Sequence, residues 1–327
     1  MKRFLIILLA FTFISSEVDI ESLIFSQFQK FITKYHKRYS SMQEYLSRFQ
    51  VFRLNFLETL HSGPKTYLVG ITKFSDMTRQ EFFKQYLNSD FPISAFLPNV
   101  NSPIKQFKNA PDAWDWREHN AIPSIRDQGS CGAAYAFSVV CNLESMYAIK
   151  KEVLKSFSMQ YLIDCDPNNA GCNGGLIDST WKWIVENRGH LMFEEDYPYT
   201  GTKGKCKADS SKYIDMTVTG YTKVSSDEEE MKEVLYNTGA LCVVLNGNPL
   251  QYYSGGVIDL SSSECNPYAI NHMTNIVGYG TTTDGLDYWI GRNSWGKIWG
   301  EEGYFRISRG KGTCGINQYV LTGTVEF

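Results

Sequence analysis

Two amphipathic helices are predicted early in the chain from the spacing of its apolar residues. Phe28, Phe31, Ile32 and Tyr35 lie at positions i, i+3, i+4 and i+7, which share one face of a helix. The following segment repeats this kind of pattern, so a second helix is expected after the first. The second apolar stripe consists of Tyr45, Phe49, Phe52 and Phe56.

A connector is predicted between residues 88 and 109, where the apolar periodicity fades. Prolines at positions 92, 98 and 103 favour an extended and exposed chain there, which is a natural region for proteolytic cleavage. The composition changes from residue 112 onward, and all eight cysteines lie beyond residue 130. The connector therefore separates an N-terminal part from a larger C-terminal part.

The C-terminal part divides into a helical half and a β half. Its longest predicted helix covers residues 135–150, and short β-branched or aromatic stretches predict strands at 241–245, 275–279, 288–291 and 304–307. This order predicts an α+β fold of two packed lobes, and ligand clefts commonly form between such lobes. Residues that can share one face of the long helix are Phe137, Val140, Leu143, Met146 and Tyr147.

The N-terminus has the pattern of a secretory signal peptide. Lys2 and Arg3 precede an apolar run at residues 4–14, which ends at the small residues Ser15 and Ser16. A membrane span needs about 20 apolar residues, so this run is too short. We expect residues 1–16 to direct the chain into the secretory pathway, towards an extracellular or lysosome-like vacuolar destination where disulfides are permitted.

Composition and charge exclude several function classes. A net charge of -3, from 32 basic and 35 acidic residues, provides no basic field for nucleic acid. Neither a Cys-x-x-Cys nor a His-x-x-x-His pair occurs, so no metal is expected, and no cofactor is predicted. No second apolar segment could span a membrane, and we expect a soluble monomer.

Residues 127–137 read Asp-Gln-Gly-Ser-Cys-Gly-Ala-Ala-Tyr-Ala-Phe at the start of the long predicted helix. This segment resembles the nucleophile motif of the papain family of cysteine proteases, which runs Gln-Gly-x-Cys-Gly-Ser-Cys-Trp-Ala-Phe. The resemblance implies an oxyanion-binding role for Gln128. It also aligns Ala134 with the nucleophilic cysteine of the family, while Ala133 and Tyr135 replace the usual serine and tryptophan.

Two further segments resemble the remaining catalytic motifs of that family. Residues 271–280 end in the same Val-Gly-Tyr-Gly, which implies that His272 matches the catalytic base. Met273 stands where alanine or glycine is common, and we expect it to fill part of the pocket for the substrate's second residue. Residues 288–300 resemble the Asn-Ser-Trp-Gly block, so Asn293 would orient the imidazole and Trp295 would shield that contact.

Residues 171–175, Gly-Cys-Asn-Gly-Gly, resemble the glycine wall of the family. The bare backbone of such a wall pairs with an extended substrate in the manner of an added strand. A Gly-Gly pair alone is more often a turn, but this one lies beside a cysteine of the family's disulfide pattern. The resemblance implies substrate contacts from Gly174, Gly175 and Leu176.

The N-terminal part resembles the helical propeptide of the same family. Glu44 and Arg48 are also spaced so that their opposite charges can pair along a helix. Thr59 and Thr72 replace the expected isoleucine and asparagine. The resemblance implies a cathepsin L-like precursor, with an inhibitory propeptide-like domain at 17–108 and a papain-like peptidase domain at 109–327. The matching positions are Glu44, Arg48, Phe52, Asn55, Gly70, Phe74 and Asp76.

The cysteines agree with the same resemblance. Cys141 and Cys242 stand in apolar company, where a free cysteine acts as a small hydrophobic residue, and no motif positions either one as a nucleophile. Secreted chains tend to pair their other thiols. The disulfides implied by the resemblance are Cys131–Cys172, Cys165–Cys206 and Cys265–Cys314.

Two functions remain open from the sequence. The first is a proteolytically inactive homologue that holds its own propeptide and binds a peptide or protein ligand in the cleft. The second is an active cysteine endopeptidase whose nucleophile was replaced at position 134. Ala133 and Tyr135 favour natural loss, because one substitution is enough to trap a precursor. A serine-type hydrolase would need a hydroxyl group at position 134.

Overall fold

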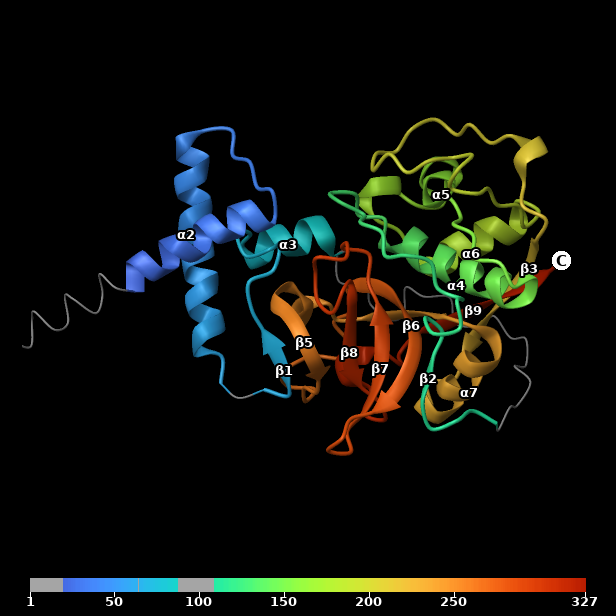
Figure 1. Ribbon diagram of the computed structural model, residues 1–327. Coiled ribbons are helices and arrows are strands. Elements are labelled where there is room, and N and C mark those ends of the chain that lie inside the picture. Colours follow the sequence, from blue (N-terminus) through green and yellow to red (C-terminus); the bar gives the residue numbers. More distant parts are fainter. Residues whose placement is uncertain (1–19, 64, 88–108) are drawn as a thin grey trace, which may run out of the picture.

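The computed structural model describes residues 20–63, 65–87 and 109–327. The expected signal peptide and nearly all of the expected connector lie outside these residues. In the described part, no helix is long and apolar enough to cross a membrane. An N-terminal region (residues 20–87) stands beside a larger body, as Figure 1 shows.

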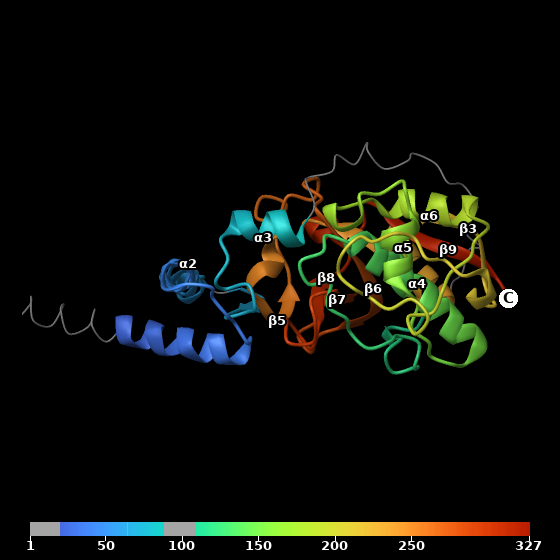
Figure 2. The same cartoon turned by 90° about the horizontal axis from the view of Figure 1, so that it is seen from above.

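Aromatic rings hold together the two helices of the N-terminal region, a helix at residues 20–34 and α2 (Met42–His61), which cross in Figure 1. In Figure 2, α2 is seen end-on beside the first helix. The Phe52 ring centroid lies 5.1 Å from that of Phe28 and 5.0 Å from that of Phe31. All three side chains are buried, and each such ring pair adds about 0.5–1.5 kcal/mol beyond the buried area. The predicted helices and their apolar stripes are confirmed.

The expected pairing of Glu44 with Arg48 is wrong. Arg48 Nη1 instead bonds Glu81 at 2.8 Å, 33 residues further along the chain. Glu44 accepts hydrogen bonds from the backbone N–H and the hydroxyl of Ser40, both at 2.6 Å. Ser41 caps α2 by accepting from the Glu44 amide. Helix capping and packing against the next helix therefore provide the direct partners of both charges.

A strand and a helix link the N-terminal region to the body. The strand β1 (Tyr67–Val69) pairs antiparallel with β5 (Tyr253–Ile258) of the body. Helix α3 (Arg79–Tyr86) then begins at a capping box between Thr78 and Glu81. The N-terminal region thus adds an edge strand to the sheet of the body.

The described strands form one nine-stranded sheet. Its order is β1-β5-β8-β7-β6-β4-β9-β3, with β2 paired to β6, and all pairings except the parallel β5–β8 pair are antiparallel. The four stretches predicted as strands all lie in it. The other strands are β2 (Trp114–Asp115), β3 (Thr217–Val224), β4 (Leu241–Leu245), β6 (His272–Thr281), β7 (Asp287–Arg292), β8 (Tyr304–Ser308) and β9 (Val320–Glu326).

Most helices of the body lie above the sheet in Figure 1, whereas α7 lies at its lower right. One core packs among the strands and another among the helices, which gives the predicted papain-like α+β fold of two lobes. The division along the chain is less strict than expected, because β2 precedes the helices and α7 lies in the β half. The helical elements of the body are α4 (Ala134–Lys151), α5 (Met159–Cys165), α6 (Ile177–Glu186), α7 (Glu228–Thr238) and the short 3₁₀ turns η2 (Gly171–Asn173), η3 (Ser210–Lys212), η4 (Asn248–Tyr252) and η5 (Thr313–Gly315).

The long helix α4 is buried on nearly all sides, well beyond the one apolar face that its sequence indicates. Its polar residues Asn142, Glu144 and Ser145 are buried, whereas Met146 is partly exposed. Asn142 Oδ1 accepts from the Gly323 amide at 3.1 Å, and its Nδ2 donates to a backbone carbonyl. These hydrogen bonds offset the cost of burying polar groups, so α4 serves as a shared wall of both lobes.

Three disulfides close loops of similar length. Two of them join residues 41 apart and the third joins residues 49 apart. Closing loops of this length lowers the entropy of the unfolded chain, which stabilises the fold by about 4 kcal/mol per disulfide. The pairs are those that the family resemblance implies: Cys131–Cys172, Cys165–Cys206 and Cys265–Cys314.

Peptide mapping without reduction should recover these three pairs and leave Cys141 and Cys242 as free thiols. Both side chains are fully buried, and burial raises the pKa of both thiols. A thiol reagent should therefore modify them only in the unfolded protein. Mass spectrometry after alkylation with and without denaturant measures this. A Cys141–Cys242 disulfide, or fast labelling of the native protein, would contradict the structure.

Candidate active site

The start of α4 is shaped by the segment that precedes it. The Cys131–Cys172 disulfide ties this segment to a neighbouring loop, and Gly132 N donates to Cys172 O at 2.8 Å. A Cβ on Gly132 would lie 2.8 Å from that same oxygen, so only glycine fits. Ala133 is the N-cap and Ala134 the first helical residue, both buried. Position 134 therefore presents a methyl group at the positive end of the helix dipole.

Gln128 is completely buried beside this helix start. Its Nε2 donates to Cys131 O at 2.9 Å, and its Oε1 accepts from the Ser294 hydroxyl at 2.5 Å. Its backbone N–H donates to Ser294 O at 2.8 Å. Hydrogen bonds from both sides therefore fix the Gln128 amide and join the first motif to the third.

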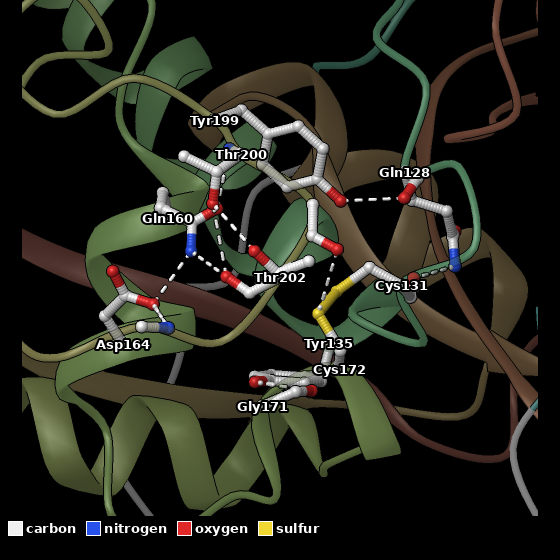
Figure 3. The surroundings of a disulfide bond; sticks show 12 residues. Gln128, Cys131, Tyr135, Gln160, Asp164, Gly171, Cys172, Tyr199, Thr200 and Thr202 are labelled. Carbon is white, nitrogen blue, oxygen red and sulfur yellow. Dashed lines mark hydrogen bonds between the residues drawn. A yellow bond between two sulfur atoms is a disulfide. The ribbon is translucent and has the colours of Figure 1, made fainter.

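A further support for Gln128 comes from the loop behind the disulfide, shown in Figure 3. Tyr199 Oη donates to Gln128 O at 2.7 Å. Gln160 holds the following loop, since it accepts from Thr200 N at 2.9 Å and donates to Thr202 O at 2.7 Å. Sequence analysis did not identify Tyr199, because a single tyrosine 71 residues from its partner has no periodic or spacing signal.

His272 and Asn293 meet beside the β6–β7 hairpin. His272 Nε2 lies 2.9 Å from Asn293 Oδ1, which also accepts from Ser294 N at 2.9 Å. An amide oxygen only accepts hydrogen bonds, so Nε2 carries the proton and Nδ1 keeps a free lone pair in the neutral ring. Among the described residues, the buried Nδ1 has no hydrogen-bond partner. The ring is therefore a base held in one orientation, with its acceptor nitrogen unused.

Trp295 covers the contact between His272 and Asn293. Its ring centroid lies 4.8 Å from that of the imidazole, and both rings are fully buried. Burial lowers the pKa of His272 from about 6.5 to about 4, although the hydrogen bond with Asn293 favours the charged ring. At neutral pH the imidazole is uncharged.

Helix α4 and strand β6 are joined next to these residues. Ser138 Oγ, one turn beyond Ala134, donates at 2.8 Å to the carbonyl of Thr274, two residues beyond His272. Asn275 Nδ2 in turn donates to Ser138 O at 2.9 Å. These buried bonds bring the helix start and the histidine strand to one place in the fold.

The Gly174–Gly175 pair of the 171–175 motif lies beside the same helix start, because a Cβ on Gly132 would be 3.6 Å from Gly174 N. Gly174 has a φ of +108°, which favours glycine. A Cβ on Gly175 would lie 2.5 Å from Asn169 Oδ1, and that oxygen accepts from Leu176 N at 2.8 Å. Asn169 therefore sets the position of this loop, and sequence analysis did not identify it.

Met273 lies in the core of the helical lobe, in the same cluster as Ala134. It is 1% exposed and faces Val244 across the β4–β6 pair. The residue that follows His272 in β6 therefore fills space in the core of the helical lobe with a long apolar side chain.

The N-terminal region covers the histidine side of the site. The rings of Phe74 and Phe82 pack edge-on against Trp295, with centroids 5.1 and 5.4 Å away. Lys73 Nζ pairs with Asp127 at 2.6 Å and donates to Trp295 O at 3.0 Å. The N-terminal region thus contacts both motifs that meet at Gln128, the first through Asp127 and the third through Trp295.

The end of α3 lies close to the histidine, with Gly247 between them. A Cβ on Gly247 would come within 2.8 Å of Leu87 and within 2.9 Å of His272. A cavity of about 550 Å³ remains between α3 and the loop before α4. Residues that line it include Phe83, Lys84, Leu87, Ser130, Gly132 and Asn173.

The residues proposed from the three motifs and the glycine pair thus come together from separate segments of the chain. The Cys131–Cys172 disulfide belongs to this site, whereas Cys265–Cys314 packs in the core of the β lobe. Ser294 was not singled out in the sequence, although it lies directly beside Asn293 in the third motif.

Comparison with known families gives two matches along the chain. The description "Papain family cysteine protease" matches residues 110–324. The description "Cathepsin propeptide inhibitor domain (I29)" matches residues 28–82, which lie in the N-terminal region.

Individual proteins resemble the chain over nearly its whole length. It is 36% identical over 313 residues to a viral cathepsin of Adoxophyes honmai nucleopolyhedrovirus, covering 91% of each protein. It is 34% identical over 357 residues to cysteine proteinase 1 of Dictyostelium discoideum, covering 99% of this chain and 100% of that protein. The solved structure of digestive procathepsin L 3 from the larval midgut of Tenebrio molitor matches with a TM-score of 0.79 and 33% identity, covering 92% of this chain and 99% of that one.

Lowering the pH should destabilise the folded protein, because folding buries His272 in its neutral form. His272 has a pKa of about 4 when buried and about 6.5 in the unfolded chain, so the unfolded state takes up the proton first. The stabilisation is fully present above about pH 6.5 and falls as the pH drops towards 4, by at most about 3 kcal/mol. Thermal unfolding of the full-length chain between pH 7.5 and 4 measures this.

The variant His272→Gln keeps a donor for Asn293 but does not titrate, so its stability should change less over the same pH range. Comparison of the two proteins at pH 7.5, where the imidazole of His272 is uncharged, provides the control for any change in packing. An identical pH dependence of the wild type and His272→Gln would show that another group is responsible.

Proposed function

Because the chain belongs to the papain family of cysteine proteases, we propose that it is a member that has lost its nucleophile and binds peptides or a protein partner without cleaving them. The observation that carries this proposal is Ala134, a methyl group at the first position of α4. The surrounding machinery, namely Gln128, His272 and Asn293, is retained.

The chemistry of the family requires a thiolate at this helix start. A helix N-terminus and an imidazolium stabilise that anion, which attacks the peptide carbonyl. Ala134 has no group that can form the covalent bond or transfer a proton to His272. The unused Nδ1 of His272 is in keeping with a base whose usual proton donor is absent.

The retained residues would have defined roles if a thiol stood at position 134. His272 would accept the thiol proton at Nδ1, and Asn293 would keep Nε2–H in place. The second N–H of the Gln128 amide would donate to the developing oxyanion, while the first stays bonded to Cys131 O. Without the nucleophile no covalent tetrahedral adduct forms, so these groups serve only to shape the cleft.

Ligand binding would use the glycine loop as a template. Among the described residues, the backbone groups of Gly175 make no hydrogen bond, so they are available to an extended peptide. Met273 and Leu176 would border the pocket for the second residue of that peptide. Since Met273 already fills space there, a small second residue is favoured.

The same proposal covers the maturation of the chain. Residues 1–16 would be a signal peptide, 17–108 the propeptide and 109–327 the peptidase domain, in a monomer that follows the secretory pathway to the cell exterior or a lysosome-like vacuole. A chain without a nucleophile does not cut its own propeptide. The N-terminal region would therefore stay on the site until another protease removes it.

An alternative is an active cysteine endopeptidase in which cysteine at position 134 was replaced. Only one substitution is needed to trap a precursor, whereas Ala133 and Tyr135 also depart from the family motif. The nucleotide sequence of the source transcript distinguishes the two, because a cysteine codon at position 134 would restore the protease interpretation.

The purified protein should hydrolyse no peptide above background, and its full-length form should remain intact on incubation in acid. Removing the nucleophile of subtilisin lowers kcat about 2 × 10⁶-fold, which sets the scale of the loss. The measurement is labelling by a thiol-directed peptide probe after the N-terminal region has been removed by an added protease. Stoichiometric labelling that a peptide inhibitor blocks would contradict the proposal.

The variant Ala134→Cys should recover weak proteolysis, because the helix dipole and His272 favour a thiolate at that position. Turnover should stay low, since Tyr135 and Met273 change the surroundings and small misplacements lower rates about 10²-fold. Adding Met273→Ala should raise kcat/KM more for substrates with a bulky apolar second residue than for those with a small one.

A matched control is the double variant Ala134→Cys with His272→Gln, which should lose the recovered activity. Circular dichroism and the unfolding temperature show whether each variant is folded. A folded Ala134→Cys protein without any activity, or an unchanged substrate preference after Met273→Ala, would mean that the site has changed further than these residues indicate.

A further inference from the structure

The described body of the protein begins at a specific polar contact. Glu233 Oε2, on α7, accepts hydrogen bonds from the backbone N–H of Asn109 at 2.8 Å and of Ala110 at 3.0 Å. Asn237, one turn further along α7, donates from Nδ2 to Asn109 Oδ1 at 3.0 Å and to Glu233 O at 2.8 Å. One carboxylate oxygen and one side-chain amide thus hold both the backbone and the side chain of Asn109.

The segment after this contact is fixed to the β lobe. Tyr279 Oη donates to Pro111 O at 3.0 Å, and β2 pairs with β6 a few residues later. Asn109 is exposed and Glu233 is half-buried, so the contact lies at the surface but is partly shielded from water. A carboxylate that faces two successive N–H groups favours a positive charge at the same place.

We propose that Glu233 and Asn237 form a binding site for a new N-terminus, which arises when another protease cuts the chain immediately before Asn109. Hydrolysis adds water across that peptide bond. The hydroxyl goes to the carbonyl carbon of residue 108, and the nitrogen of Asn109 becomes an amine that is protonated at neutral pH. An ammonium group then replaces the neutral N–H that is now 2.8 Å from Glu233.

Asn109 fits this role better than the residue after it. With Asn109 as the first residue, the bonds of Glu233 to both nitrogens and the bond of Asn237 to the side chain are retained. A cut one residue later would lose the contacts of Asn109. The inference concerns the fate of the cleaved chain, so it goes beyond the proposed function and holds whether or not the site at Ala134 is active.

Other charged and titratable groups surround this contact. Lys232 of α7 lies over the Tyr279 ring and pairs with Glu229 of the same helix. Arg309, which follows β8, also lies over the Tyr279 ring. His119 stacks on Trp114, whose ring also contacts Tyr236 of α7. All of these groups are present before and after cleavage. A comparison of cut with uncut protein therefore isolates the effect of the new amine.

The test places a single defined cut before Asn109. Replacing residues 104–107 by four aspartates, ahead of the natural Lys108, creates a site for enteropeptidase, which cuts after that lysine and leaves Asn109 as the first residue. The full-length protein is prepared as wild type, Glu233→Gln and the control Glu230→Gln, an exposed residue of the same helix. Unfolding temperatures are measured before and after cutting, from pH 6 to pH 10.

After cutting, Glu233→Gln should unfold about 1–4 °C below the wild type at pH 6–7, and Glu230→Gln should not. An amine whose pKa is raised by a carboxylate stabilises the fold fully below its ordinary pKa of about 8, and this stabilisation is lost as the pH rises through the raised value. The difference between cut wild type and cut Glu233→Gln should therefore shrink above pH 8, whereas the uncut pair should show no such pH dependence.

A second measurement is the pKa of the new amine, from the rate of its acylation at each pH by mass spectrometry. A raised pKa in the cut wild type and a lower one in cut Glu233→Gln support the proposal. Equal pKa values in the two proteins overturn it. If Glu233→Gln does not fold, the cut wild type alone tests the proposal. An ordinary pKa of the Asn109 amine in that protein would mean that Glu233 does not bind the amine.

Discussion

The structure depends on the burial of α4 between the two lobes. Cys141 and Ala148 of this helix pack in the core of the β lobe, while Val139 and Leu143 pack in the core of the helical lobe. A helix buried on nearly all sides needs partners for the polar groups that it carries. Glu144, which is 0% exposed, uses Oε1 both to pair with Arg126 and to accept a backbone N–H at 2.8 Å. Because α4 belongs to both lobes, its N-terminus lies where they meet.

The site follows from that position of the helix end. Ser138 ties the first turns of α4 to β6, which brings His272 next to the loop that carries Gln128. Trp295 then excludes water from the histidine, and the aromatic residues of the N-terminal region exclude water from Trp295. The same burial lowers the pKa of His272. Coverage of the site and the charge state of its base are therefore consequences of one packing arrangement.

Folding and chemistry place different demands on position 134. The packing around it asks only for a small, apolar side chain, because Ala134 is 1% exposed within the helical-lobe core. The contacts that arrange Gln128, His272 and Asn293 come from the backbone, from Ser294 and from Tyr199, and none of them involves the side chain at 134. A thiol at this position would add reactivity but little stability. For this reason the fold itself does not require a thiol at position 134.

The sequence by itself determined the helices of the N-terminal region, four strands of the body (β4, β6, β7 and β8) and the motif segments of the site, because periodicity and motif spacing are local properties of the chain. Only the tertiary structure decided that β1 pairs with β5, that Arg48 binds Glu81 and not Glu44, and that Tyr199 supports Gln128. It also showed that α4 is buried on nearly all sides, beyond the one apolar face that its own pattern indicates. Such contacts join residues tens to hundreds of positions apart, and they depend on which surfaces pack together once the lobes have formed. No local pattern encodes that choice.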